Sequence, residues 1–360
     1  GRKLMAHAKI AGGFEEGLKG ASVSVAEFHD DRTPLKKLQQ WLHHTPSAVP
    51  LIVLVASIIV FGLLSPNFLT ATTLSTILQQ ISIVGILGIA QALIVLTAGI
   101  DLSVGAIAVF SSVLMGQFTF RYGIPAPAAI ALGLMLGTAM GLLNGWLVAR
   151  LRLPPFIATL GTWQILLASN FIFSKNETIR SSEIAEQAPM LQFWGNSIQP
   201  GGVKVLYAVF LMVALVAVMA WVLRHTAWGR HVYATGDDPV AAELAGVPTK
   251  RRLMQVYALA GFFCAGAGWV MIGRFGSVSP TASTGQLGNI QSITAVVIGG
   301  ISLFGGRGSI IGMFFGAMIV GVFEMGLRLV GTDPQWTFFL IGVLIICAVA
   351  VDQWIRKVSV

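Results

Sequence analysis

Two carboxylates lie within long apolar stretches of this sequence, and they are the first places where chemistry is expected. Asp101 lies in the segment TAGIDLSVG (Thr97–Gly105), and Glu324 lies in a run that is otherwise almost wholly apolar. A carboxylate at that depth is costly and is usually functional. For Asp101 two roles stay open, capping of a helix that begins at Leu102 or Ser103 and direct contact with a solute. For Glu324 the sequence does not decide between the interior of a bundle and its outer face.

The residue types and their spacing predict no enzymatic or metal site. The six histidines all lie in polar segments, so no chain of carboxylates and histidines for proton relay runs through the apolar stretches. Cys264 and Cys347 lie in separate apolar runs, a pattern typical of small core residues rather than of a disulfide or a metal site. The motif Gly-x-x-x-x-Gly-Lys-Ser/Thr does not occur. We therefore expect no catalytic role, no cofactor, and no ATP binding through a P-loop within this sequence.

Uncharged polar side chains are scattered through the apolar runs instead. Amide and hydroxyl groups suit a neutral polyol such as a sugar, and an aromatic ring such as that of Trp163 could stack on a sugar face. The alternative for most of these groups is hydrogen bonding between helices, worth about 0.6 kcal/mol per contact in a membrane bundle. Six residues are the candidates for a solute path: Gln91, Asp101, Ser103, Asn144, Trp163 and Gln164.

The composition predicts an all-α polytopic membrane protein. Apolar residues make up 55% of the 360 and charged residues 11%, whereas a soluble domain has roughly 25% charged residues. The net charge of +8 does not indicate nucleic acid, because the basic residues lie at the ends of apolar runs. About ten runs are suited to span a membrane, and half-helices or re-entrant segments stay open for the third and eighth: 49–64, 77–98, 103–119, 125–148, 156–173, 203–223, 254–273, 289–304, 309–328 and 335–352.

The distribution of basic residues gives the orientation. With the N-terminus placed inside, 17 of the 23 lysines and arginines fall in inside segments, as the positive-inside rule requires. Both termini are then cytoplasmic. The predicted organisation is a cytoplasmic tail over 1–47, a membrane domain over 48–353, and a cytoplasmic end over 354–360. Within the membrane domain the largest outer loop is 174–202 and the largest inner loop is 224–253.

The inner loop contains a short helix of its own. In Gly229–Arg252, Asp238 is a good N-cap with a proline directly after it, and Gly246 with a proline two residues later is a stop signal. Val240 and Leu244 are four residues apart and therefore share one face. The helix is too short to cross a bilayer, so the pattern favours a device that contacts another protein. The alternative is an ordinary connecting loop.

Glycines recur at intervals of four in two of the runs, spacing that lets helix backbones approach closely in lipid. Because these two runs are five spans apart, they have opposite directions. That arrangement favours an inverted repeat of spans 2–5 and 7–10, a design common among transporters. The glycines expected to pack helices together are Gly133, Gly137, Gly141 and Gly145 in the fourth span, and Gly308, Gly312 and Gly316 in the ninth.

Four motifs resemble those of a known family. QALIVLTAGIDLSVG (Gln91–Gly105), GLLNGWLVARLRLPPFIATLG (Gly141–Gly161), VYATGDDPVAAELAGVPTKRR (Val232–Arg252) and AVVIGGISLFGGRGSIIG (Ala295–Gly312) are similar to segments of the ribose-type sugar permeases of bacterial ABC importers. The resemblance extends over most of 50–352, and most closely to fructose- and ribose-transporting members. It implies a multi-pass protein of the bacterial inner membrane that transports a monosaccharide by alternating access.

The resemblance also implies partners. In this family the permease forms a dimer in the lipid membrane, binds ATP-hydrolysing subunits and receives sugar from a periplasmic sugar-binding protein. The large cytoplasmic loop docks on the ATP-hydrolysing subunit, a role that would fall here on Asp237, Asp238, Val240, Glu243, Leu244, Gly246 and Lys250. A stand-alone, ion-coupled secondary transporter of a small polar solute is the alternative. The particular sugar is not given by the sequence.

Overall fold

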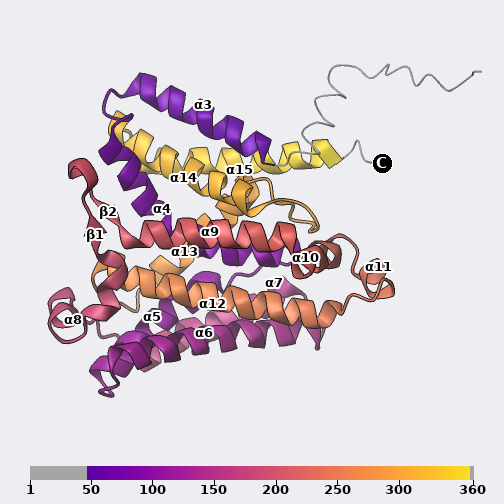
Figure 1. Ribbon diagram of the computed structural model, residues 1–360, viewed down its shortest axis with the longest axis horizontal. Coiled ribbons are helices and arrows are strands. Elements are labelled where there is room, and N and C mark those ends of the chain that lie inside the picture. Colours follow the sequence, from indigo (N-terminus) through magenta and orange to yellow (C-terminus); the bar gives the residue numbers. More distant parts are fainter. Residues whose placement is uncertain (1–46, 357–360) are drawn as a thin grey trace, which may run out of the picture. The chain divides into compact units, whose positions relative to one another are not determined.

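The chain is helical almost throughout the part described by the computed structural model, residues 47–356 (Figure 1). The predicted tail lies outside these residues, apart from its last position. The long helices are α3 (Ala48–Leu64), α4 (Ala71–Leu96), α5 (Val104–Phe120), α6 (Ala126–Ala149), α7 (Pro155–Ser174), α9 (Tyr207–His225), α12 (Thr249–Phe275), α13 (Ala282–Ile298), α14 (Ile310–Val330) and α15 (Pro334–Arg356). Shorter elements are α8 (Ser181–Gln187), η1 (Pro189–Gly195), β1 (Ser197–Ile198), η2 (Pro200–Gly202), β2 (Val205–Leu206), α10 (Ala227–Asp237) and α11 (Pro239–Leu244).

The prediction of an all-α polytopic membrane protein is confirmed. Among the described residues, α4, α6, α7, α9, α12 and α14 are long and apolar enough to cross a membrane. Helices α3 and α5 and the part of α15 over Gln335–Val351 are apolar but shorter. The eighth run, 289–304, is displaced in the structure, because α13 begins at Ala282 and ends at Ile298. Gly300, which has a φ of +75°, turns the chain after the helix.

Helices α5 and α13 meet in the interior at their N-terminal ends. The chain turns sharply between α4 and α5, where Ala98 adopts a left-handed φ of +60°. A Cβ atom on Gly105 of α5 would collide with the carbonyl of Gly285 in α13. The side-chain oxygen of Asn289 accepts a hydrogen bond from the Gly105 N–H at 2.5 Å. The first turns of α5 and α13 are therefore in direct contact, and the absence of a Cβ on Gly105 permits it.

The same set of helix contacts occurs twice in the bundle. Helices α4 and α12 pack against each other, and so do α5 and α13. Helix α4 also contacts α13 and α14, as α12 contacts α5 and α6. Helix α5 contacts α6 and α7, as α13 contacts α14 and α15. The lengths of α4 to α7 are 26, 17, 24 and 20 residues, and those of α12 to α15 are 27, 17, 21 and 23.

The glycines of α6 lie at close helix contacts. A Cβ on Gly137 would lie 2.5 Å from the Cβ of Ala265 in α12, and one on Gly145 would lie 2.9 Å from the Cβ of Tyr257. Gly141 faces the Tyr257 carbonyl in the same way, and Gly133 faces Met115 of α5. Helix α6 therefore approaches α12 backbone to backbone, as expected for small residues at helix interfaces in lipid.

The prediction that Gly308, Gly312 and Gly316 share one helix is wrong for Gly308. Helix α14 begins at Ile310 because Ser309 caps it, its hydroxyl accepting from the Gly312 N–H at 3.0 Å. Gly308 precedes the helix with a φ of +123°. Gly312 and Gly316 face the end of α13. Gly137, Gly141 and Gly145 of α6 face α12, whereas Gly312 and Gly316 face α13, so these parts of the two predicted rows do not lie at equivalent contacts.

The connections gather at two ends of the bundle. Helices α10 and α11 lie at one end, opposite α8 and the antiparallel β1–β2 pair (Figure 1). At the α8 end, Ile179 pairs with Val278, and Arg121 forms an ion pair with Glu177 at 2.9 Å. The α8 end contains the loop 174–202, which is predicted to lie outside. The α10–α11 end contains the loop 224–253, which is predicted to lie inside.

Candidate functional site

Asp101 lies in a buried polar cluster at the turn between α4 and α5. Its Oδ1 accepts hydrogen bonds from the N–H and the hydroxyl of Ser103, both at 2.6 Å. The amide of Asn144, from α6, donates to the Ser103 hydroxyl at 2.8 Å. Three of the six predicted path residues are thus brought together. The predicted capping role is wrong in position, because α5 begins at Val104 and Asp101 holds Ser103 instead.

The remaining three predicted path residues do not join this cluster. Gln91 is fully buried in α4, and neither of its amide atoms has a partner within residues 47–356. Trp163 lines a separate recess beside α5, together with Asn170. Gln164 is exposed on α7. Burial without a hydrogen bond costs about 1–3 kcal/mol for a neutral group, so Gln91 is a place where an ordered water is expected.

Two residues that hold the turn after α4 are not among the six predicted path residues. The amide of Asn289 in α13 donates to the Leu102 carbonyl, while its oxygen accepts from Gly105. The buried hydroxyl of Thr159 in α7 accepts from the Leu102 N–H at 3.1 Å. Both are polar residues within apolar runs, and this is the only feature of the sequence that could have indicated their role at the turn. The turn is therefore held from two helices distant in the chain.

Glu324 faces the bundle interior and links several helices. Its Oε2 accepts from the amide of Gln80 in α4, and its Oε1 accepts from the amide of Gln291 in α13 at 2.9 Å. Arg274 of α12 donates to the backbone carbonyl of Gln80 at 2.8 Å. The question that the sequence left open for Glu324 is thereby answered in favour of the interior. We call Glu324, Gln80, Gln291 and Arg274 the Glu324 network.

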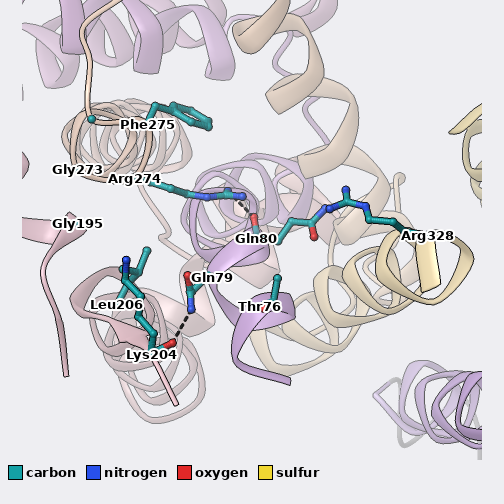
Figure 2. Close-up of a pocket in the computed structure, with 11 residues that line it drawn as sticks. Thr76, Gln79, Gln80, Gly195, Lys204, Leu206, Gly273, Arg274, Phe275 and Arg328 are labelled. Atoms are coloured by element: carbon teal, nitrogen blue, oxygen red, sulfur yellow. Dashed lines mark hydrogen bonds between the residues drawn. The ribbon is translucent and has the colours of Figure 1, made fainter. Parts of the chain in front are cut away.

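A basic hollow of about 450 Å³ opens beside the Glu324 network. Figure 2 shows Arg274 and Arg328 on either side of Gln80, with Lys204 close to Gln79. The Gln79 amide donates to the Lys204 carbonyl at 2.6 Å. Three cationic side chains from different parts of the chain therefore line one polar opening at the α8 end of the bundle.

At the opposite end, α11 has the predicted cap and stop. The Oδ1 of Asp238 accepts from the N–H groups of Val240 and Ala241, both at 2.9 Å. Gly246 follows the helix with a φ of +85°. The side chains of Val240 and Leu244 are 67% and 86% exposed. An apolar, solvent-facing pair on a capped helix is thus available for contact with a partner.

The other residues expected to dock surround this helix. A hollow of about 410 Å³ beside α11 is lined by Glu243, Gly246 and Lys250, and also by Arg150 and Arg251. The Glu243 carboxylate accepts a hydrogen bond from the Thr249 hydroxyl. Asp237 is exposed at the end of α10. The surface around α11 therefore carries both signs of charge, with Arg150, Lys250 and Arg251 in the hollow and acidic residues at both ends of the helix.

Helix α10 touches two interior connections through glycines. A Cβ on Gly236 would collide with the Leu96 carbonyl, and it would lie 2.8 Å from the backbone nitrogen of Gly306. The Gly306 N–H donates a hydrogen bond to that same Leu96 carbonyl at 3.0 Å. Gly305 lies against both Gly236 and Ala98. We call Gly236, Gly305 and Gly306 the glycine junction. It joins α10 to the α4–α5 turn and to the α13–α14 connection.

A tyrosine supports the glycine junction. The Tyr233 hydroxyl donates to the Gly308 carbonyl at 2.8 Å. Burial raises the pKa of Tyr233 to about 12, so the hydroxyl remains protonated and keeps its donor role over the physiological range.

Residues 73–349 match the family described as the permease component of branched-chain amino acid transport systems. The chain is 62% identical to the fructose import permease protein of Rhizobium meliloti over 348 residues, 96% of each chain. It is 35% identical to the ribose import permease protein of Escherichia coli K12 over 314 residues, 87% of this chain and 94% of that one. It is 33% identical to the galactose/methyl galactoside import permease protein of Haemophilus influenzae over 301 residues, 80% of this chain and 88% of that one.

Proposed function

This chain belongs to the family of permease components of membrane transport systems, and from that premise we propose that it moves a monosaccharide across the bacterial inner membrane as the membrane subunit of an ATP-binding-cassette importer. The observation that carries the proposal is similarity over nearly the whole chain to proteins named as sugar import permeases. The 62% identity to a fructose permease favours a fructose-like sugar. The chain itself performs no covalent chemistry in this scheme.

The proposed topology has ten spans, cytoplasmic termini and an inverted repeat. The repeat relates α4–α7 to α12–α15, and the recurrence of the same contacts and similar helix lengths supports it. The distribution of lysine and arginine supports the orientation. The proposed membrane domain covers 48–353, with α10 and α11 in the cytoplasm and α8 and the β1–β2 pair outside.

The proposed partners bind at opposite ends. An ATP-hydrolysing subunit docks on α11, where Val240 and Leu244 supply apolar contact and Asp237, Asp238, Glu243, Gly246 and Lys250 surround them. A periplasmic sugar-binding protein delivers sugar at the α8 end, and two copies of the chain form the transport unit. Energy reaches the sugar path through the glycine junction, because α10 contacts both interior connections there.

Substitution of Leu244 tests the docking surface. In membranes that contain the chain with its ATP-hydrolysing and sugar-binding partners, Leu244→Asp is expected to lower sugar-stimulated ATP hydrolysis and uptake about tenfold or more. The reason is that a charge would be buried without a partner at the interface. Leu244→Met, which keeps an apolar side chain, is the matched control and is expected to retain activity. Unchanged uptake with Leu244→Asp would rule out docking at this position.

One observation favours the ion-coupled alternative, namely that Asp101 is 2% exposed and has no ion-pair partner in the described part of the chain. The two functions differ in what drives uptake. Sugar uptake by the isolated chain under a sodium or proton gradient, without ATP, would support the alternative. Co-purification with a P-loop ATPase and dependence of uptake on ATP would support the importer.

A further inference from the structure

A small hollow lined by hydroxyl groups lies between α5, α12 and the start of α13. Its volume is about 200 Å³, and the hydroxyl groups come from Ser112, Ser277, Ser279, Thr281 and Thr284. We call it the hydroxyl chamber. The remaining lining residues are apolar, and none of the lining side chains is charged. It therefore differs in chemistry from the neighbouring basic hollow, with which it shares Phe275.

A narrower recess beside α7 adjoins the chamber. Val109 lines both, and the recess of about 10 Å³ adds Trp163 and Asn170. Asn170 is 2% exposed, and its amide nitrogen donates to the Pro280 carbonyl at 2.9 Å. Its oxygen has no partner among residues 47–356. A fixed, buried acceptor without a partner in the described chain thus lies beside the chamber.

The size and chemistry of the chamber suit one small neutral polyol. At about 30 Å³ per water molecule, 200 Å³ corresponds to roughly six or seven waters, comparable with one monosaccharide ring. Serine and threonine hydroxyls both donate and accept, so they can follow the alternating groups of a sugar. An ionic ligand would lose its hydration without gaining an opposite charge in this lining. The indole of Trp163 offers an apolar face with a specific geometry.

The position of the chamber also fits passage from the outer end. The Thr178 hydroxyl, in the segment after α7, donates to the Ser279 hydroxyl at 3.4 Å, so the chamber lies beside the outer connections. On its inner side Gly285 lines the recess and contacts Gly105 closely. The meeting of α5 and α13 therefore closes the way towards Asp101. A ligand in the chamber would therefore lie on the outer side of the contact between α5 and α13.

We propose that the hydroxyl chamber is the first binding site for the sugar within the permease, with Trp163 and the Asn170 oxygen as specificity-determining contacts. The proposal rests on the proposed import of a monosaccharide and names the site on this chain that receives it. The basic hollow of Figure 2 stays outside this site, because its three cations suit an anion better than a neutral sugar.

The first test compares aromatic and small side chains at position 163. Uptake of D-fructose is measured in proteoliposomes that contain the permease, the ATP-hydrolysing subunit and the sugar-binding protein. Trp163→Ala is expected to lower uptake at limiting sugar about tenfold, and Trp163→Phe is expected to keep most of the uptake. Phe156→Ala, at an exposed aromatic residue of the same helix, is the matched control and should resemble the unsubstituted chain.

The second test detects sugar in the chamber without relying on transport. A background lacking both cysteines, Cys264→Ala with Cys347→Ser, receives Ser279→Cys. A membrane-impermeant thiol reagent added from outside is expected to modify the new cysteine, and D-fructose supplied with the binding protein is expected to slow modification several-fold. The same substitution at Thr178, which does not line the chamber, should be modified at a rate independent of the sugar.

The outcomes separate this proposal from the function on which it rests. If the unsubstituted chain fails to import any monosaccharide with its partners, the proposed function is wrong. If it imports fructose, but Trp163→Ala does so equally well and sugar leaves the modification of Ser279→Cys unchanged, the chamber is not the binding site and the importer assignment stands. Slower modification together with a loss confined to limiting sugar supports the chamber.

Discussion

Single carboxylates in this bundle are held by neutral donors rather than by salt bridges. Asp101 accepts from Ser103, and Glu324 accepts from Gln80 and Gln291. A buried ion pair often gains less than its desolvation costs, and its removal leaves an unpaired charge. The amide donors of Glu324 join helices, because Gln80 comes from α4 and Gln291 from α13, whereas Asp101 is held within its own turn. Glu324 therefore acts as a connector within the fold.

Replacement of Glu324 tests this connecting role. Glu324→Gln keeps the shape but sets an amide group against the amide of Gln80 or Gln291, so one hydrogen bond is lost and two donors face each other. We expect a loss of about 1–3 kcal/mol in the free energy of unfolding, visible as a lower Tm in detergent. The double variant Glu324→Gln with Gln80→Glu reverses donor and acceptor and should recover part of the loss. An unchanged Tm for Glu324→Gln would contradict the role.

At the scale of helices, the glycine junction makes α10 the contact between the inner loop and the interior turns. The backbones of α10, the α4–α5 turn and the α13–α14 connection touch where side chains are absent. Contacts of this kind leave no soft side chain to absorb a displacement. Movement of α11 on a partner would therefore be passed on to the turn that holds Asp101, by way of Gly236.

Enlarging Gly236 tests this coupling. Gly236→Ala places a methyl group against the Leu96 carbonyl, so α10 must shift away from the turn. We expect the complex with the ATP-hydrolysing subunit to form, but the sugar imported per ATP hydrolysed to fall about tenfold. Gly161→Ala, a helical glycine with open space around it, is the control. Tyr233→Phe adds no volume, removes the bond to Gly308, and should lower the ratio in the same direction. A normal ratio in both variants would exclude the coupling role.

The elements differ in how far the sequence predicts them. Helix α11 follows from local signals, since Asp238 and Gly246 lie at its ends. The start of α13 does not, because the polar stretch around Gly285 becomes helical only where α5 packs against it. The site shows the same division. Asp101 and Ser103 are neighbours in sequence, whereas Asn289 reaches the same turn from α13.

For the molecule as a whole, the sequence predicts membrane class, family and the order of helices, but not the hollows. The hydroxyl chamber draws on α5, α12 and α13, and the basic hollow brings Lys204 together with Arg274 and Arg328. Such groupings depend on how helices pair, which periodicity within one run does not report. The inverted repeat illustrates the point. Most glycines of the rows that suggested it face non-equivalent helices, α12 in one row and α13 in the other, and the recurring helix lengths and contacts support it instead.

The meeting of the α5 and α13 N-termini has an electrical consequence. Each helix N-terminus is equivalent to roughly half a positive charge, so two N-termini together are similar in size to the charge of one carboxylate. The N-termini of α5 and α13 meet at Gly105 and Gly285, and Gly105 lies shortly after Asp101 in the chain. The positive end of α5, directly after Asp101, therefore offsets part of a negative charge there without a bound cation. Fructose uptake by the complete complex in proteoliposomes is therefore expected not to change when a potassium gradient with valinomycin sets the membrane potential. Uptake that rises with an inside-negative potential would show that charge crosses with the sugar. Such an importer would accumulate sugar in the cell without dissipating the ion gradients across the membrane.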